Sequence, residues 1–421
     1  MCREMKDSGI EWIGEIPREK SIINLKHVLS YIKGKNPNEI NDIGKGKPYI
    51  GASDLDKDRG YLEYKNYCDE DLPCAEKEDV LVLWDGARAG LIGTNHEGYI
   101  SSTIVKILPN IKYIKKRFFY WYLRGAEKYL FEQVRGTTIP HMSREFIDNM
   151  GMIDFSLNEQ EQIVKYLDKK VSEIDDIILK QKSLIEKYKA YKQSLITETV
   201  TKGLNKNVSM KDSGIEWIGE IPKHWDITKI SNIAEVGSGG TPNRQNKELW
   251  NGNINWMSSG EVNMQYVYET KEKITESGLN SISSPLLPVN TVMLGLIGQG
   301  KTKGMTAILC VESACNQNLA YCICKKEIYH HKYLFYSFKA MYKFLRGVIG
   351  ESQAGIYLGF LKECKIIVPS IEEQKEITDF LDKKCEAIDS AISKKEQLIE
   401  KLESYKKSLI YECVTGKREV N

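Results

Sequence analysis

The stretch MKDSGIEWIGEIP at residues 5–17 returns unchanged at residues 210–222. Thirteen consecutive identities at an offset of 205 residues indicate a duplication, because unrelated segments do not match over such a length. A second pair of segments, residues 158–203 and 372–417, aligns without gaps at an offset of 214, with about half of its positions identical. The chain is therefore a tandem repeat of a head, a variable segment and a helix-like segment.

The segments between the repeated parts, residues 18–157 and 223–371, share only an outline of similarity. Neutral drift after an old duplication does not explain this contrast, because drift would not spare thirteen residues and erase most of the next 140. We interpret the two variable segments as parts that differ in specificity, held in a common frame.

The helix-like repeats carry apolar residues at intervals of three and four, close to a heptad, over about 40 residues without proline or glycine. Neither stripe can be buried by its own helix, so pairing of the two copies is expected. Gly203 and Gly416 follow the two runs, where glycine often ends a helix. The residues expected to pack between the helices are Ile163, Leu167, Ile174, Ile178, Leu184 and Leu195 in the first copy, and Ile377, Leu381, Ile388, Ile392, Leu398 and Leu409 in the second.

The variable segments predict short strands at residues 79–84, 99–108, 290–294, 307–311 and 319–324, each set followed by an aromatic helix at residues 118–134 or 329–349. The expected fold is α+β, with two pseudo-two-fold-related globular domains separated by an antiparallel coiled coil of two long helices. The expected boundaries are 1–157 for the first domain with its head at 5–17, 158–203 for the first helix, 204–371 for the second domain with its head at 210–222, and 372–421 for the second helix.

The charge of the chain is nearly balanced, with 60 Lys and Arg against 58 Asp and Glu. This argues against a simple polycationic binder, so any nucleic-acid contact has to come from segregated basic groups. No apolar run approaches the roughly 20 residues of a membrane span, and the first residues form no signal-peptide core. We expect a cytoplasmic protein with reduced cysteines.

Polar loops of the variable segments offer groups suited to DNA. Residues 237–244 (GSGGTPNR) and 298–304 (GQGKTKG) combine glycine with hydroxyl, amide and cationic side chains. Residues 85–90 (DGARAG) stand in the first segment where GQGKTKG stands in the second, and residues 101–103 (SST) stand where residues 316–318 (NQN) do. No counterpart of GSGGTP is evident in the first segment. Asn and Gln can pair with adenine through two hydrogen bonds, whereas Ser and Thr are permissive, and surface turns with polar caps remain the alternative interpretation.

Catalytic motifs are mostly absent. The chain contains no phosphate-binding GxxxxGK[ST], no GxSxG, no HExxH and no Pro-Pro pair of the kind that an adenine methyltransferase requires. Asp56 with Glu63, Tyr64 and Lys65 resembles a nuclease pattern only by chance spacing, and the cluster Cys310, Cys315, Cys322 and Cys324 favours buried strand residues over zinc. We expect no catalytic residue and no metal site.

The combination of SGIEWIGEIP, TPNRQNKELWNGNINWMSSGEV, GQGKTKG, the NQN run and a helix opened by Pro369-x-x-x-Glu373-Gln374 resembles the specificity subunit of type I restriction–modification systems. The likeness covers nearly the whole chain. It implies a non-catalytic subunit with two target recognition domains, each reading one half of a bipartite sequence in double-stranded DNA. The resemblance also implies two methylation subunits that bind S-adenosylmethionine, and restriction or translocase subunits that use ATP and magnesium; this chain itself would bind no cofactor.

By the same resemblance, the residues expected to face DNA in the first domain are Arg88, Ser101, Ser102, Thr103, Thr137, Thr138 and His141. In the second domain they are Thr241, Arg244, Ser258, Ser259, Lys301, Lys303, Asn316, Gln317 and Tyr357. Two other functions stay open: a self-contained DNA methyltransferase or nuclease fragment, and a coiled-coil protein scaffold without a DNA role.

Overall fold

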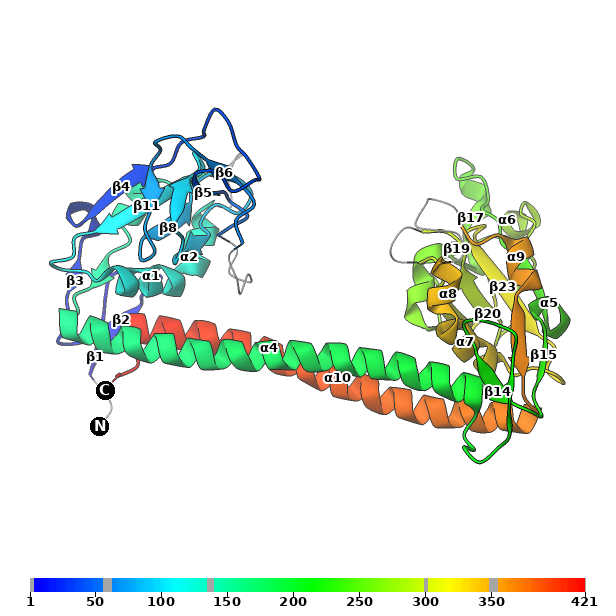
Figure 1. The fold of residues 1–421 in the computed structure, drawn as a ribbon. Helices are drawn as coiled ribbons and strands as arrows, with labels where there is room; N and C mark the ends of the chain where they lie inside the picture. Colours follow the sequence, from blue (N-terminus) through cyan, green and yellow to red (C-terminus); the bar gives the residue numbers. More distant parts are fainter. Residues whose placement is uncertain (1–3, 56–62, 135–139, 299–301, 348–354, 421) are drawn as a thin grey trace. The chain divides into compact units, whose positions relative to one another are not determined.

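The computed structural model describes residues 4–55, 63–134, 140–298, 302–347 and 355–420. The chain divides into two compact units, which are described separately. Unit 1 comprises Met1–Lys182 with Glu396–Asn421, and unit 2 comprises Ser183–Lys395. Each unit combines sheets with helices, so the α+β class predicted from the sequence is confirmed (Figure 1).

Unit 1 contains two four-stranded sheets, in the orders β4-β11-β8-β9 and β6-β5-β10-β7. Helices α1 (Lys116–Gly125), α2 (Glu127–Val134) and α3 (Arg144–Asp148) accompany them, with a short 3₁₀ helix at Leu25–His27. The strands of unit 1 are β1 (Met5–Asp7), β2 (Glu15–Pro17), β3 (Ile22–Ile23), β4 (Leu29–Lys33), β5 (Lys47–Ile50), β6 (Tyr67–Cys68), β7 (Cys74–Ala75), β8 (Val80–Leu83), β9 (Ile92–Gly93), β10 (Gly98–Ile100), β11 (Ile104–Pro109) and β12 (Met152–Ile153).

Unit 2 is built around a five-stranded sheet in the order β16-β23-β20-β21-β18 and a three-stranded sheet in the order β19-β17-β22. Its strands are β13 (Met210–Asp212), β14 (Glu220–Pro222), β15 (Asp226–Lys229), β16 (Ala234–Ser238), β17 (Trp250–Met257), β18 (Tyr266–Val267), β19 (Glu272–Ile274), β20 (Val292–Gly295), β21 (Thr306–Leu309), β22 (Ser313–Cys315), β23 (Leu319–Cys324) and β24 (Lys365–Val368). Its shorter helices are α5 (Ile230–Ile233), α6 (Glu276–Asn280), α7 (His331–Ala340), α8 (Tyr342–Gly347) and α9 (Leu358–Glu363), with 3₁₀ helices at Lys247–Leu249 and Ser259–Met264.

The predicted strands are found with one difference. The run at residues 99–108 is not a single strand, because the turn at residues 101–103 separates β10 from β11, and these two strands belong to different sheets. The two aromatic helices are likewise each divided, into α1 and α2 in unit 1 and into α7 and α8 in unit 2.

Two long helices dominate the chain, α4 (Leu157–Lys202) and α10 (Ile371–Val414). Each begins with a serine that precedes a glutamate by three positions: Glu159 accepts hydrogen bonds from Ser156, and Glu373 accepts them from Ser370. Gly203 and Gly416 have φ of 73° and 66°, so both predicted glycine stops adopt the left-handed conformation. Within the residues that the structure describes, no helix is long and apolar enough to span a membrane.

The long helices run antiparallel within each unit. In unit 1 the first half of α4 shares a core with the last residues of α10, and in unit 2 the last turns of α4 share a core with the first half of α10. Lys406 pairs with Asp175 in unit 1, and Lys192 pairs with Asp389 at 2.6 Å in unit 2. Both ion pairs use the same two repeat positions, since the repeats are offset by 214 residues.

Most of the predicted stripe is buried or partly buried, but two members are exceptions. Leu184 and Leu398 are 37% and 39% exposed. The buried residue at that level of α4 is Ile185, which is 6% exposed. The buried stripe therefore continues from Ile178 by a full heptad to Ile185. The sequence prediction selected Leu184, the apolar residue next to it, and was wrong at this position.

The two identical heads form hairpins, β1-β2 and β13-β14, and each packs on the end of the long helix from the other repeat. In unit 1 the carbonyl oxygen of Ile13 accepts hydrogen bonds from Tyr411 at 2.9 Å and Lys417 at 2.8 Å. In unit 2, Ile221 is buried with Val200 near the end of α4. The heads are alike because the helix ends that they contact are repeats of each other.

Buried glutamines attach each unit to the start of its long helix. Gln160 donates to the carbonyl oxygens of Tyr113 and Phe155 and accepts from the backbone N–H of Lys115. Gln374 makes the same three bonds, to Ile328, Pro369 and His330. Both side chains are almost fully buried, at 1% and 0% exposure.

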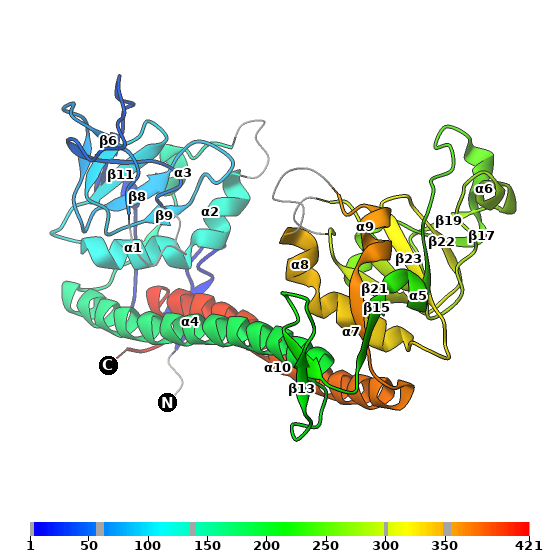
Figure 2. The same ribbon diagram turned by 45° about the vertical axis from the view of Figure 1, so that its right-hand side comes forward.

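A carboxylate two turns further along each helix holds the aromatic helix of the same unit. Asp168 accepts from Arg117 and from the indole of Trp121, both on α1. Asp382 accepts from Lys332 and from the hydroxyl of Tyr336, both on α7. In each unit the aromatic helix therefore lies against its long helix (Figure 2).

Replacing Gln374 by Ala should remove three hydrogen bonds and leave three backbone groups without partners. Since each buried unsatisfied group costs roughly 1–3 kcal/mol, we expect a loss of about 3 kcal/mol or more in the free energy of unfolding, measured by urea denaturation. Gln397, which is exposed on the same helix, is the matched control, and Gln397→Ala should leave the unfolding midpoint unchanged. Equal stabilities for the two variants would contradict the role assigned to Gln374.

Candidate nucleic-acid interface

In unit 1 three polar loops meet where β8 ends. The backbone N–H of Trp84 donates to Thr103 at 2.7 Å, and the N–H of Met142 donates to the carbonyl oxygen of Trp84 at 2.8 Å. The N–H of Gly86 donates to Pro140 at 3.1 Å. The loops that carry Arg88, the SST run and His141 are thus joined by their main chains.

Unit 2 repeats this pattern where β20 ends. The N–H of Leu296 donates to Asn318 at 2.9 Å, and the N–H of Ile356 donates to Leu296 at 2.8 Å. Gly304 donates to Gly295 as Gly90 donates to Leu83, each at 2.8 Å. The predicted pairing of DGARAG with GQGKTKG, and of SST with NQN, therefore has the same backbone register in both units.

The structure also supplies the counterpart of GSGGTP that the sequence did not reveal. Gly34 donates to Ile104 as Gly239 donates to Leu319, and the next residues, Lys35 and Gly240, donate to Ile100 and Cys315. Residues 33–38 (KGKNPN) therefore correspond to residues 238–243 (SGGTPN). The expectation that the first segment lacks this loop was wrong, and Lys33, Lys35 and Asn36 join the candidate interface.

Both loops, residues 33–38 and 238–243, require glycine where their backbone passes close to the backbone of a neighbouring strand. A Cβ atom on Gly34 would lie 2.2 Å from the carbonyl oxygen of Ile100, and one on Gly239 would lie 1.9 Å from that of Cys315. The clash is with backbone, which cannot move without breaking the register. The glycine is the signal that could have revealed KGKNPN from the sequence.

An acid, an imidazole and a lysine lie together on the unit 1 face. Asp85 accepts hydrogen bonds from Nδ1 of His141 and, at 3.2 Å, from Lys33. Burial alone raises the pKa of the Asp85 carboxyl, but these two hydrogen bonds outweigh it and hold the pKa below its ordinary value. The His141 ring also meets the indole of Trp84 edge-on. His141 is thus held at the surface by Asp85 and Trp84.

The other predicted DNA-facing residues of unit 1 differ in how far their side chains are exposed and free to contact a ligand. Arg88 is exposed and donates to the carbonyl oxygen of Ala52 at 3.0 Å. Ser101 is only 6% exposed and bonds to the hydroxyl of Thr103 at 2.9 Å, which makes it a structural residue of the turn. Ser102 is half-buried, and its backbone N–H donates to Asn36 at 3.2 Å. Thr137 and Thr138 lie outside the described residues.

Two predicted residues of unit 2, Ser258 and Asn316, make hydrogen bonds within the fold. The hydroxyl of Ser258 donates to Glu261 at 2.8 Å and caps the 3₁₀ helix that Ser259 begins. Asn316 is 8% exposed, and its side-chain oxygen accepts from the N–H of Asn318. These contacts explain the polar residue types without any ligand.

Arg244 is also engaged. It pairs with Glu272 through both terminal nitrogens and lies 4.0 Å above the ring of Trp250. The hydrogen bond from Arg244 lowers the pKa of the Glu272 carboxyl. Any DNA phosphate would have to compete with this carboxylate for the guanidinium group.

The remaining predicted residues of unit 2 lie on the joined loops. Thr241 donates to the side-chain oxygen of Gln317 at 2.6 Å, and Gln317 is exposed. Tyr357 is 64% exposed at the residue before α9. Lys303 belongs to the loop between β20 and β21, where its carbonyl oxygen accepts from Arg346. Lys301 lies outside the described residues.

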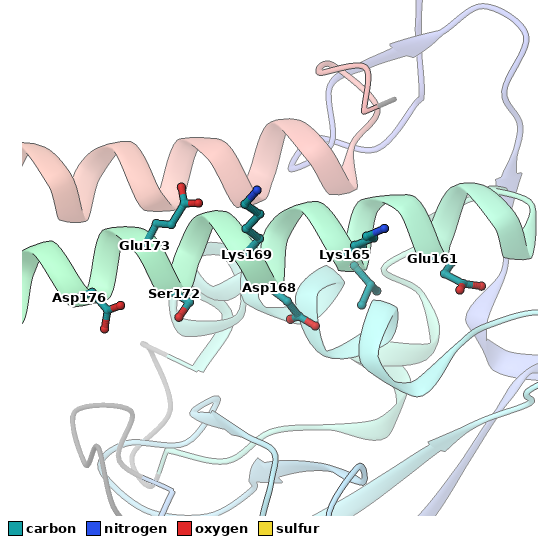
Figure 3. A pocket seen from close by; sticks show the side chains of 8 residues that line it. Glu161, Lys165, Asp168, Lys169, Ser172, Glu173 and Asp176 are labelled. Carbon is teal, nitrogen blue, oxygen red and sulfur yellow. The ribbon is translucent and has the colours of Figure 1, made fainter.

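A pocket of about 710 Å³ on α4 is not part of this interface. Four of its eight lining residues are acidic, and Figure 3 shows them spaced along α4. The repeat positions on α10 reverse some charges, since Lys375 corresponds to Glu161 and Asp379 to Lys165. The pocket is lined by Glu161, Val164, Lys165, Asp168, Lys169, Ser172, Glu173 and Asp176. The charge pattern of this surface is therefore not shared by the two repeats.

The residues with metal or nuclease spacing form no centre in the described parts of the chain. No group of three or more His, Cys, Asp or Glu residues there could hold a metal ion. Cys315 and Cys322 are buried, and burial raises the pKa of the Cys315 thiol to about 12. Asp56 lies outside the described residues.

The sequence matches the family model of the type I restriction modification DNA specificity domain twice, over residues 17–187 and 222–404. The chain belongs to this family. Each match begins at the last residue of a head, Pro17 or Pro222, and covers the variable segment and much of the long helix that follow. The family is thus identified from both copies of the repeat.

Relatives of the family extend over most of the chain. The MjaVIII type I restriction enzyme specificity subunit of Methanocaldococcus jannaschii is 28% identical over 415 residues, covering 96% of this chain and 94% of the relative. The EcoR124I/EcoR124II specificity subunit of Escherichia coli is 28% identical over 235 residues, covering 54% of this chain and 52% of the relative.

Solved structures share the fold. A chain from a study of complex assembly and conformational transition of the type I R-M system has a TM-score of 0.74 at 15% identity, covering 96% of this chain and 99% of its own. The HsdS subunit from Thermoanaerobacter tengcongensis has a TM-score of 0.53 at 15% identity, covering 96% and 98%. At this identity the likeness concerns the fold.

Replacing Gly239 by Ala should disrupt the joined loops of unit 2, because the new methyl group meets a carbonyl oxygen. We expect a loss of about 2–3 kcal/mol in the free energy of unfolding, measured by denaturant titration. Gly359 on α9 has nothing within 4 Å of the place that a methyl group would occupy, so Gly359→Ala is the control and should stabilise the chain by up to about 1 kcal/mol. Equal effects of the two substitutions would show that the close approach is absent.

Proposed function

We propose that this chain is the DNA sequence-recognition subunit of a type I restriction–modification complex, in which each unit reads one half of a bipartite target. The observation that carries the proposal is the shared backbone register of the two loop sets. One main-chain framework presents Lys33, Asn36 and Ser102 in unit 1, but Ser238, Thr241 and Gln317 at the same positions in unit 2. A common frame with different polar side chains suits two readers of different half-sites.

The chain directs chemistry that its partners perform. Methylation subunits would bring S-adenosylmethionine to adenine, and restriction or translocase subunits would use ATP and magnesium. The residues of this chain contribute hydrogen-bond donors, acceptors and cations to DNA, and its helices contribute a spacer. It binds no cofactor itself and acts in the cytoplasm, where the DNA of the cell lies.

The long helices offer a surface that is both exposed and repeated. Leu184, Lys187, Tyr191 and Ser194 lie on exposed positions of α4 in unit 2, at spacings of three and four. The identical residues Leu398, Lys401, Tyr405 and Ser408 occupy exposed positions of α10 in unit 1. We call these two sets the repeated stripes.

Exposed helix residues need not stay identical for folding, so the repeated stripes favour a role in binding. Tyr191 and Tyr405 are 57% and 48% exposed, which leaves large aromatic faces in water. Because the stripes are identical, we infer that they dock two copies of one partner, the methylation subunit. This deepens the role of the two helices beyond that of a spacer.

Replacing residues 18–157 by the corresponding segment of a relative with another target should change only one half of the methylated sequence. The measurement is a genome-wide map of adenine methylation in cells that also carry the methylation subunit. The unaltered half of the motif is the internal control. A map that shows no split motif for the wild-type complex would contradict the proposal and would favour the scaffold interpretation.

Replacing Tyr191 and Tyr405 together by Ala should weaken assembly with the methylation subunit by about 100-fold or more, because each loses an aromatic anchor. Size-exclusion chromatography with light scattering gives the stoichiometry, and each single variant should retain one strongly bound partner copy. Tyr268, which is 73% exposed outside the stripes, provides the control Tyr268→Ala. Unchanged assembly of the double variant would place the partner elsewhere.

A further inference from the structure

Asn36 is an exposed loop residue whose carboxamide orientation is fixed by the fold. Its Oδ1 atom accepts from the backbone N–H of Ser102 at 3.2 Å and from the hydroxyl of Tyr49 at 2.8 Å. A backbone N–H can only donate, so the atom that faces Ser102 has to be the oxygen. The alternative, flipped amide would place two donors against each other.

Two donors occupy both acceptor positions of this oxygen. The two N–H bonds of Nδ2 are then the groups that Asn36 has to offer, and no described residue accepts a hydrogen bond from them. Asn36 is flanked by the exposed lysine Lys35 and lies close in sequence to the exposed Lys33. Asn36 and Lys35 therefore offer donors at this corner of unit 1, whereas Lys33 already donates to the acceptor Asp85.

Tyr49 is the positioning residue of this arrangement. Tyr49 is 7% exposed and packs with Cys68 and Tyr99, so its hydroxyl has little freedom. A tyrosine hydroxyl is protonated at neutral pH and can donate, and burial raises the pKa of the Tyr49 hydroxyl further. Asn36 is thus oriented by a group that does not itself face the solvent.

Unit 2 fixes a carboxamide by the corresponding contact, with the residue types exchanged. Positions 36 and 102 correspond to positions 241 and 317, and here Thr241 donates to the side-chain oxygen of Gln317. The Gln317 oxygen has one donor, whereas the Asn36 oxygen has two. The Gln317 oxygen keeps an acceptor position free, and the Asn36 oxygen does not.

We propose that Asn36 is a specificity-determining residue that acts as a donor only and selects guanine in the half-site read by unit 1. A carboxamide pairs with adenine by donating to N7 and accepting from the N6 amino group, which requires a free oxygen. Guanine presents two acceptors, N7 and O6, at its major-groove edge. The inference rests on the proposed function.

The test uses the full chain assembled with its methylation subunit and duplexes that carry the methylated motif. Asn36→Asp keeps an oxygen for Ser102 and Tyr49 but exchanges the donating nitrogen for an acceptor, so binding should fall by about 10- to 100-fold. Asn149→Asp, at an exposed position after α3, adds the same charge and is the control. Binding by Asn36→Asp that equals the control would overturn the proposal.

Base analogues identify the contact. Replacing each guanine of the half-site by 7-deazaguanine removes N7, and one such replacement should weaken wild-type binding several-fold but leave binding of Asn36→Ala unchanged. If the loss caused by 7-deazaguanine is the same in the wild type and in Asn36→Ala at every guanine, the proposal is overturned. A wild-type complex without any sequence preference would instead refute the proposed function, so the two failures are distinguishable.

Tyr49→Phe tests the occupancy of the oxygen separately. Without the Tyr49 hydroxyl, Oδ1 regains an acceptor position, and the variant should accept adenine at the position where the wild type requires guanine. The readout is the methylation map, in which one position of one half-site should become a mixture of the two purines. A strict guanine in this variant would contradict the argument that the bound oxygen sets the choice.

Discussion

A buried glutamine at the first turn of each long helix is the contact on which the arrangement of each unit depends. Gln160 and Gln374 each satisfy two carbonyl oxygens and one N–H of the segments around the helix start, in an environment closed to water. Because an unmade bond there would be costly, the direction in which each helix leaves its unit is fixed. Asp168 and Asp382 add a second attachment, and with it the orientation of α1 and α7.

The repeat, the fold class and both long helices could be predicted because they depend on identity and periodicity, which a sequence displays directly. The loop at residues 33–38 could not, because what it shares with residues 238–243 is a set of main-chain bonds and one glycine, not its side chains. The prediction of the buried stripe was wrong at Leu184 for a related reason. Leu184 and Ile185 are both strongly apolar, and only packing decides which of them is buried.

Candidate site residues were harder to predict than fold. Ser258 and Asn316 have the residue types of DNA contacts, yet the Ser258 hydroxyl donates to Glu261 and the Asn316 side-chain oxygen accepts from the N–H of Asn318. Residue type cannot distinguish a group that caps a turn from one that is free to bind. Asn36 shows the converse, since its internal bonds leave its donors available and define what they can recognise.

The division of the chain has a consequence for its synthesis. Unit 2 is one continuous stretch, Ser183–Lys395, whereas unit 1 needs both Met1–Lys182 and Glu396–Asn421. On the ribosome, the core of unit 2 can close while the first 182 residues still lack the helix end that carries Tyr411 and Val414. The part of the protein made first is therefore completed last, because its core gains the apolar residues of the α10 end, and Ile13 gains its hydrogen bond from Tyr411, only when the final residues have been made.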